Sequence, residues 1–135
     1  EDLQTELKAG KVSDDSIARC ATALGMSIGR LHGHGLRNRD LKFDNLVRDP
    51  ETDSIAIVDL DGISQHAAEE TRGCGRDLGR LLAAFLHADS PGGEQTLRRF
   101  VRSYVRTRRR MLQAPPMKRI LKRAESRAKE WAVRH

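Results

Sequence analysis

The sequence predicts a mainly α-helical protein with one small β-hairpin, an α+β fold of 135 residues. Several long segments repeat apolar residues at helical spacing, whereas residues 55–58 form a short β-branched run typical of a strand. No apolar run approaches the roughly 18 residues of a membrane span, and no signal-peptide pattern opens the chain. A chain of this length can bury about two-thirds of its unfolded surface, so we expect one compact core.

The first helix is expected after Ser13, which has the features of an N-cap with Asp14 and Asp15 in the first turn. About a dozen residues precede it, and Gly33 and Gly35 end it. The apolar residues of this helix recur at Ile17, Cys20, Ala21, Leu24, Ile28 and Leu31. A hairpin then follows, in which residues 46–47 and 55–58 flank a polar turn at 49–53.

A second helix is expected from about Arg76 to His87, after a Gly-rich turn that holds Cys74. A break at 90–93 and a long helix to about Gln113 follow, and two prolines at 115–116 precede the last helix. We therefore divide the chain into a main lobe, residues 1–112, and a basic C-terminal helix, residues 113–135, that packs on or extends from it.

Two acidic motifs lie at the ends of the predicted hairpin. Residues 38–45 read Asn-Arg-Asp-Leu-Lys-Phe-Asp-Asn, which fits the kinase catalytic-loop pattern His-Arg-Asp-Leu-x-x-x-Asn except that Asn38 replaces His. Residues 57–62 read Ile-Val-Asp-Leu-Asp-Gly, with Asp59 at the place of the metal-binding Asp of the Asp-Phe-Gly element and Asp61 at its Gly. The sequence therefore predicts half of a phosphoryl-transfer site.

Each residue of these motifs has an expected role. Asp40 is the candidate base that faces the acceptor hydroxyl, and Lys42 would contact the transferring phosphate of ATP. Asn45 and Asp59 would hold Mg²⁺ or Mn²⁺, because hard oxygen ligands suit these ions. An isolated Arg-Asp-Leu is common in helix caps and surface turns, so the joint pattern, and not any one piece, favours a kinase.

The chain resembles the bacterial lipopolysaccharide kinase family, which phosphorylates Kdo or heptose sugars of the inner core. The likeness covers roughly residues 13–110. It runs through residues 31–35, 38–42, 58–61, 76–82 and 98–104. The resemblance implies a protein-kinase-like C-terminal lobe, ATP with Mg²⁺ or Mn²⁺ as cofactor, and a sugar hydroxyl on a glycolipid as acceptor. It also implies that Asp77 is a buried structural anchor that accepts backbone hydrogen bonds from residues near Asn38 and Arg39.

Other parts of a kinase have no candidate in the sequence. A Gly-rich loop over the phosphates and a strand Lys paired with a helix Glu are both missing. We therefore expect the C-terminal lobe of a longer enzyme, inactive without its N-terminal lobe. The 17 residues between Asp59 and Asp77 lack Ala-Pro-Glu, which closes the peptide-binding segment of protein kinases, and this favours a sugar over a protein acceptor.

Positive charge is concentrated at the C-terminus. Residues 97–135 hold 14 Lys and Arg against two Glu, while the whole chain has a net charge of +6. This asymmetry predicts an anionic partner, either lipopolysaccharide phosphates or an anionic membrane surface, unless the helices are merely solvated. Nucleic acid is disfavoured, because only Phe100, Tyr104 and Trp131 could stack on bases there. The candidate anion-binding residues are Arg98, Arg99, Arg102 and Arg106.

The remaining polar signals are weak. Cys20 and Cys74 lack neighbours at metal-ligand spacing, so we expect reduced structural thiols. Helix-end or solvated roles are expected for His32, His34, His66 and His87, which have no partner visible in the sequence. These features predict a cytoplasmic protein, with peripheral contact at the inner face of the cytoplasmic membrane.

Two alternatives to a sugar kinase stay open. The first is a pseudokinase remnant whose basic helices bind a membrane or nucleic acid. The second is an atypical serine/threonine protein kinase.

Overall fold

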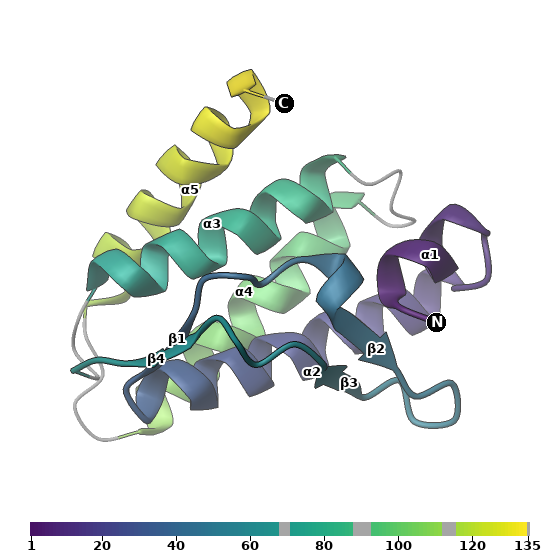
Figure 1. Ribbon diagram of the computed structural model, residues 1–135, viewed down its shortest axis with the longest axis horizontal. Coiled ribbons are helices and arrows are strands. Elements are labelled where there is room, and N and C mark those ends of the chain that lie inside the picture. Colours follow the sequence, from purple (N-terminus) through teal and green to yellow (C-terminus); the bar gives the residue numbers. More distant parts are fainter. Residues whose placement is uncertain (68–70, 88–92, 112–115, 135) are drawn as a thin grey trace.

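A computed structural model describes residues 1–67, 71–87, 93–111 and 116–134, and it shows the expected mainly helical α+β fold (Figure 1). The described helices are α1 (Leu3–Lys8), α2 (Asp14–Gly33), η1 (Phe43–Asn45), α3 (Thr71–His87), α4 (Gly93–Arg110) and α5 (Met117–Arg134). The described strands are β1 (Leu36–Asn38), β2 (Leu46–Arg48), β3 (Ile55–Ile57) and β4 (Ile63–Gln65).

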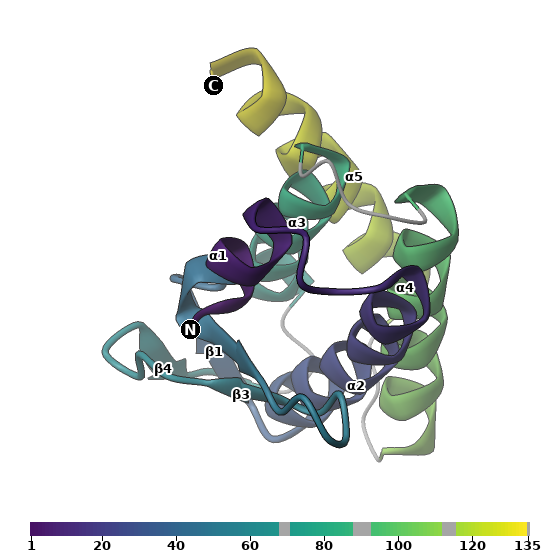
Figure 2. The ribbon, with the colours of Figure 1, turned by 90° about the vertical axis from the view of Figure 1, so that its right-hand side faces the viewer.

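Two helix pairs form the body of the protein. Helix α2 packs along α4, and α3 packs along α5, while α3 also touches α4 and so joins the pairs. Two small antiparallel sheets, β1 with β4 and β2 with β3, lie beside α2 (Figure 2). The core fills the space between these layers. Its largest fully buried apolar side chains include Ile17, Leu24, Phe43, Leu78 and Phe100.

The predictions for the first long helix and the hairpin are confirmed. Ser13 caps α2, because its hydroxyl accepts a hydrogen bond from the amide of Ser16 at 3.1 Å. Helix α2 ends at Gly33, as its glycines predict. In the hairpin, β2 pairs with β3 so that Leu46 faces Ile57 across the sheet. Asp53 closes the turn, where its buried carboxylate accepts hydrogen bonds from Arg19 and Arg48.

The N-terminal residues hold a helix that the apolar pattern did not reveal. Helix α1 is capped by Asp2, whose carboxylate accepts the amide of Thr5 at 2.8 Å. Leu3 is fully buried, and Glu6 pairs with Arg48 of β2 at 2.8 Å. A helix of six residues has too few turns to show apolar periodicity, so contacts to the hairpin stabilise it.

The expected start of the second helix is wrong. Helix α3 begins at Thr71, about five residues before Arg76, and Cys74 is a buried helical residue, not part of a turn. Glycine is a poor helix former, but α5 packs against this part of α3, so tertiary contacts outweigh local propensity. Strand β4 was also not predicted, because its polar residues Ser64 and Gln65 give no apolar alternation.

The C-terminal helices agree with the predicted order. Helix α4 ends at Arg110, about three residues before the expected end. Of the predicted break at 90–93, Gly93 instead begins α4, while residues 90–92 and Pro115 lie outside the described residues. Helix α5 follows Pro116 and is packed on the main lobe. Its buried residues Met117, Ile120, Ala124 and Ala128 belong to the common core. Of the described helices, none combines the length and apolarity needed to cross a membrane.

Candidate functional site

Residues 38–45, here called the Asp40 loop, connect β1 to β2 and lie against α3. Leu41 and Phe43 are buried, and the Phe43 ring meets Phe85 of α3 edge-on with centroids 5.0 Å apart. The side chains between and beside them are polar, and Lys42 and Asp44 are exposed while Asp40 is half-buried. The alternating apolar residues Leu41 and Phe43 therefore anchor the loop in the core, while the polar residues between and beside them stay at or near the surface.

Hydrogen bonds fold the Asp40 loop back on itself. The Nδ2 of Asn45 donates to the carbonyl oxygen of Asp40 at 2.9 Å, and the amide of Asp40 donates to the Oδ1 of Asn38 at 3.0 Å. Within the described chain, nothing donates to the Oδ1 of Asn45. The Asn45 amide is thus oriented by its nitrogen and keeps its oxygen as an acceptor.

Residues 58–62, here called the Asp59 segment, run beside the Asp40 loop. The amide of Val58 donates to the carbonyl oxygen of Asn45 at 3.0 Å, and that of Arg39 donates to the carbonyl oxygen of Gly62 at 3.2 Å. A Cβ atom at Gly62 would lie only 2.7 Å from an Asp40 carboxylate oxygen, so a larger residue there would displace the Asp40 side chain. The fold therefore brings the two sequence motifs together.

Gly62 is a site residue whose importance the sequence did not reveal. It ends the second motif, but the comparison with Asp-Phe-Gly drew attention to the preceding position, Asp61. A glycine next to an aspartate in a motif is the signal that could have indicated close backbone approach.

The Asp40 carboxylate faces a cavity of about 620 Å³ between the Asp40 loop, α1 and α3. Lys42 and Asp44 line it, and the Lys42 ammonium lies 3.7 Å from the Asp44 carboxylate at the surface. Lys8 of α1 and Arg80 of α3 add two cations that the sequence did not assign to the site. Arg80 was detectable in principle, because it is one helical turn after Asp77 and so lies on the side of α3 near the loop.

Asn45 and Asp59 offer a partial set of metal ligands. Asp59 is exposed and accepts the amide of Asp61, also exposed, at 3.2 Å. Among the described residues, no three His, Cys, Asp or Glu side chains converge as a metal site. Mg²⁺ commonly uses one or two carboxylates and completes its shell with water and substrate phosphates. The oxygen donors present fit an ion of that kind better than a resident ion held by the protein alone.

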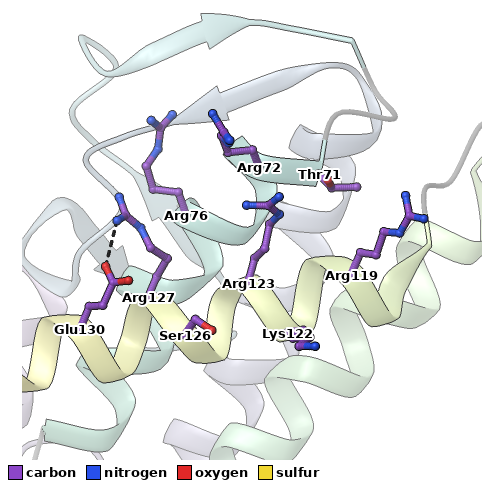
Figure 3. Close-up of a pocket in the computed structure, with 9 residues that line it drawn as sticks. All are labelled: Thr71, Arg72, Arg76, Arg119, Lys122, Arg123, Ser126, Arg127 and Glu130. Atoms are coloured by element: carbon purple, nitrogen blue, oxygen red, sulfur yellow. Dashed lines mark hydrogen bonds and ion pairs between the residues drawn. The ribbon is translucent and has the colours of Figure 1, made fainter.

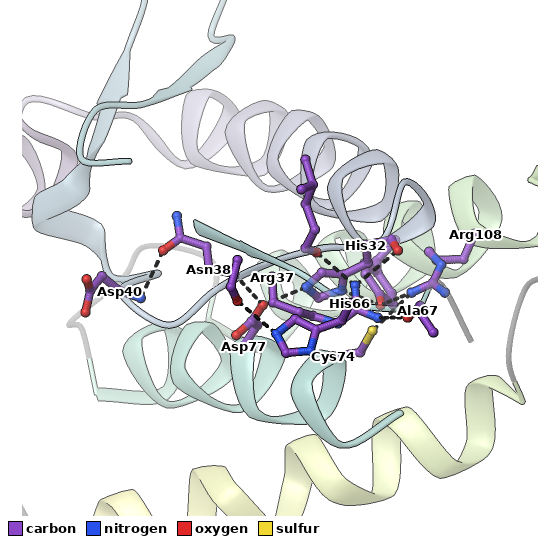
Figure 4. A network of polar contacts seen from close by, with 12 residues as sticks. His32, Arg37, Asn38, Asp40, His66, Ala67, Cys74, Asp77 and Arg108 are labelled. Atoms are coloured by element: carbon purple, nitrogen blue, oxygen red, sulfur yellow. Dashed lines mark hydrogen bonds and ion pairs between the residues drawn. The ribbon is translucent and has the colours of Figure 1, made fainter. Parts of the chain in front are cut away.

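Asp77 holds the Asp40 loop from behind, as predicted. Its carboxylate is fully buried, and Oδ2 accepts the backbone amide of Asn38 at 2.9 Å (Figure 4). The same oxygen lies 2.9 Å from the Nε2 of His32. A buried carboxylate that joins α3 to the start of the loop fixes where the loop begins.

His32 has partners that the sequence did not identify. It lies in the last turn of α2 but is fully buried, and its Nδ1 is 2.7 Å from the hydroxyl of Tyr104. Burial is the largest single influence and by itself would lower the pKa of His32, but the contacts with Asp77 and Cys74 together outweigh burial and raise the pKa. We call these two residues the His32–Asp77 anchor.

Two arginines complete the network around this anchor. Arg37 is fully buried and donates to the carbonyl oxygens of His32, Leu36 and Ala67. Arg108 is also fully buried and donates to the Tyr104 hydroxyl at 2.9 Å. Arg108 is therefore not available to an external anion, because its side chain points into the core toward Cys74 of α3.

The other basic residues of α4 are at the surface. Arg98, Arg99, Arg102 and Arg106 are exposed, and Arg98 pairs with Glu94 at 2.8 Å. None of them lines the Asp40 cavity. Phe100 and Tyr104 are fully buried and so cannot stack on nucleobases, whereas the side chain of Trp131 is outside the described part of the structure.

Neither cysteine lines the Asp40 cavity, and among the histidines whose side chains are described none does. His34 is exposed, His66 contacts the Ser64 hydroxyl at 2.9 Å, and the side chain of His87 is not among those described.

Both cysteines are free and buried, and burial raises the pKa of the Cys20 thiol to about 12. A thiol with such a pKa stays protonated at neutral pH, which fits a structural role for Cys20.

A scan against models of known protein families gave no match for this chain, and a search of curated proteins gave no match either.

Proposed function

We propose that this chain is the protein-kinase-like C-terminal lobe of an ATP- and Mg²⁺-dependent phosphotransferase. The observation that carries the proposal is the paired support of Asp40. The Asn45 side chain donates a hydrogen bond to the carbonyl oxygen of Asp40, and the buried carboxylate of Asp77 accepts one from the backbone amide of Asn38. This arrangement combines a carboxylate for the acceptor hydroxyl with an amide oxygen and a second carboxylate for a metal.

In the proposed reaction, each side chain acts by position and charge. Asp40 accepts a hydrogen bond from the acceptor hydroxyl and takes its proton as the hydroxyl attacks the terminal phosphate of ATP. Lys42, Lys8 and Arg80 line the cavity in front of Asp40 and offset negative charge there. Asn45 and Asp59 would hold the metal ion, which when bound neutralises phosphate charge.

We propose a sugar hydroxyl of the lipopolysaccharide inner core, Kdo or heptose, as the acceptor. The stretch between Asp59 and Asp77 already contains β4 and the first turn of α3, which begins at Thr71. Little chain is left there to seat an extended peptide beside Asp40. Cations at the cavity suit an anionic sugar such as Kdo, because a carboxylate accepts charge-assisted hydrogen bonds from Lys and Arg.

Apolar side chains beside Asp59 support the expected second lobe. Val58 and Leu60 are 49% and 64% exposed, whereas most large apolar side chains of the described residues are buried. Exposed apolar groups next to a candidate metal ligand suit cover by a nucleotide base or by an N-terminal lobe.

The test is phosphate transfer in the complete enzyme, with its N-terminal lobe, from labelled ATP to purified core oligosaccharide. Asp40→Asn should reduce turnover by about 10² to 10⁴ while the protein stays folded, because a proton acceptor is replaced by an amide of the same shape. Asp49→Asn is the matched control, since Asp49 is an exposed carboxylate in the hairpin turn, outside the Asp40 cavity.

Two results would overturn parts of this proposal. Turnover close to that of the parent in Asp40→Asn would remove Asp40 as the base. Transfer to generic protein substrates with none to core oligosaccharide would favour an atypical serine/threonine protein kinase.

A binding role without catalysis is the second candidate. It is favoured by the exposure of Asp59 and Asp61. Among the described residues, no third His, Cys, Asp or Glu forms a metal-binding group with them. A pseudokinase of this kind would keep the His32–Asp77 anchor but would not respond to Mg²⁺.

A further inference from the structure

A second cavity, of about 790 Å³, lies between α3 and α5, and cations line it (Figure 3). It shares no lining residue with the Asp40 cavity. We call it the basic groove. Its cations are Arg72 and Arg76 of α3 and Arg119, Lys122, Arg123 and Arg127 of α5.

Close packing of the two helices puts these cations face to face. A Cβ atom at Gly75 would lie 2.5 Å from the Cβ of Arg123, and one at Gly79 would lie 2.6 Å from that of Arg127. Only glycine therefore allows this approach, although glycine costs about 1 kcal/mol against alanine within a helix. Figure 3 shows the guanidinium groups of Arg72, Arg76 and Arg123 projecting to the same side of α5.

Within the described chain, the positive charge of the basic groove is largely uncompensated. Glu130 is the one carboxylate among the described lining residues, and it pairs with Arg127 at 3.1 Å. No carboxylate of the described chain forms an ion pair with Arg72, Arg76 or Arg123. The Nε of Arg76 is buried and has no hydrogen-bond partner among the described residues. Like charges held this close repel, so an anion in the groove would stabilise the α3–α5 contact.

We propose that the basic groove binds the phosphate groups of a multiply charged ligand. The planar guanidinium of arginine matches phosphate oxygens with two parallel hydrogen bonds, and several arginines here surround one space. The hydroxyls of Thr71 and Ser126 line the same space and can donate to phosphate oxygens. Thr71 also opens the 17-residue helix α3, whose N-terminus favours negative charge.

The shape and lining of the groove favour a compact ligand over nucleic acid. None of the described lining residues is aromatic and could stack on bases, and two helices bound the groove on either side. A free polyphosphate and a phospholipid headgroup present the same chemistry. The binding site stands independently of the proposed transferase activity, because it uses none of the residues assigned to that reaction.

The test uses the 135-residue chain and inorganic tripolyphosphate, with affinity measured by isothermal titration calorimetry. Arg72→Gln combined with Arg123→Gln should weaken binding by about tenfold or more, since each charge-assisted hydrogen bond contributes roughly that factor. Arg109→Gln combined with Arg110→Gln is the matched control, which removes the same charge from the end of α4, outside the groove, and should change affinity by less than about threefold. All four arginines are exposed, so both double variants should keep the fold, which circular dichroism checks.

A second arm identifies the source of the phosphate. Vesicles of phosphatidylglycerol in phosphatidylcholine are titrated with the same proteins, with and without tripolyphosphate as competitor. The site is supported if binding to either probe depends on Arg72 and Arg123 but not on the control pair. The probe that binds then identifies whether the ligand is a free polyphosphate or a phospholipid headgroup. Equal losses in both double variants would show a response to net charge alone and would overturn the site. Absence of binding to both probes would also overturn it.

Discussion

The two sides of the Asp40 loop are built in opposite ways. Behind the loop, the His32–Asp77 anchor is fully buried and bonded at 2.7 to 2.9 Å to Tyr104 and to the Asn38 amide. In front of it, Asp59 and Asp61 are exposed. The back of the loop is thus held by contacts within the protein, whereas the front leaves its carboxylates to water or to a ligand.

The difference follows from the free energy of burying polar groups. Burial of a carboxylate is costly unless hydrogen bonds replace its hydration, and the Oδ2 of Asp77 has two such partners, whereas its Oδ1 has none among the described residues. An exposed carboxylate keeps its water and adds little to stability in either direction. A binding surface can therefore stay open at the front while the position of Asp40 is determined from behind.

The largest expected effect is at the anchor. Asp77→Ala should lower the free energy of unfolding by about 3 to 5 kcal/mol, because His32 and the Asn38 amide would lose their shared buried partner. Asp61→Ala, on the open side, should change it by less than about 0.5 kcal/mol. Urea unfolding measures both. Equal effects of the two substitutions would contradict the contrast between the sides.

The open side should respond to metal. Mg²⁺ at about 100 times its dissociation constant should raise the free energy of unfolding by about 2.7 kcal/mol, because it binds only the folded protein. Asp59→Ala should abolish this response, unless Asp61 replaces part of the lost carboxylate, in which case Asp59→Ala combined with Asp61→Ala should abolish it; Asn45→Ala should weaken it. Thermal melts with and without Mg²⁺ make the comparison, and Asp49→Ala should behave as the parent. A parent that does not respond to Mg²⁺ would favour the pseudokinase alternative.

The smallest expected effect is the pH dependence of the anchor. The folded state raises the pKa of His32, so it binds the proton more tightly than the unfolded chain does. The stability that results is fully present below the unfolded pKa of about 6.5 and is lost as pH rises through the folded pKa. His32→Gln should flatten this dependence of the urea midpoint on pH. A parent that gains stability as pH rises through this window would contradict the sign.

The positions of the cations show what a charge pattern in the sequence can predict about an anion-binding site. The basic C-terminal region predicted an anion site on α4, at Arg98, Arg99, Arg102 and Arg106. That site stays a prediction, while six cations converge in the basic groove, where α3 supplies Arg72 and Arg76. Sequence counts locate charge along the chain, but convergence depends on which helices pack together.

The sequence by itself determined the local elements of this protein. Ser13 begins α2, the β-branched run at 55–57 forms β3, and residues 38–45 fold into a loop closed by Asn45. Caps, strand propensity and short loops depend on neighbours within a few residues, which a sequence shows directly. The contact of Asp77 with the Asn38 amide was predicted only through resemblance to kinases.

Tertiary structure alone decided the contacts between distant segments. His32 meets Tyr104, which is 72 residues further along the chain, and Arg108 enters the core beside it. The start of α3 at Thr71 depends on packing against α5. Whether an arginine is buried, or a histidine bonded, depends on packing between helices far apart in sequence, and periodicity cannot encode which side chains will face each other there.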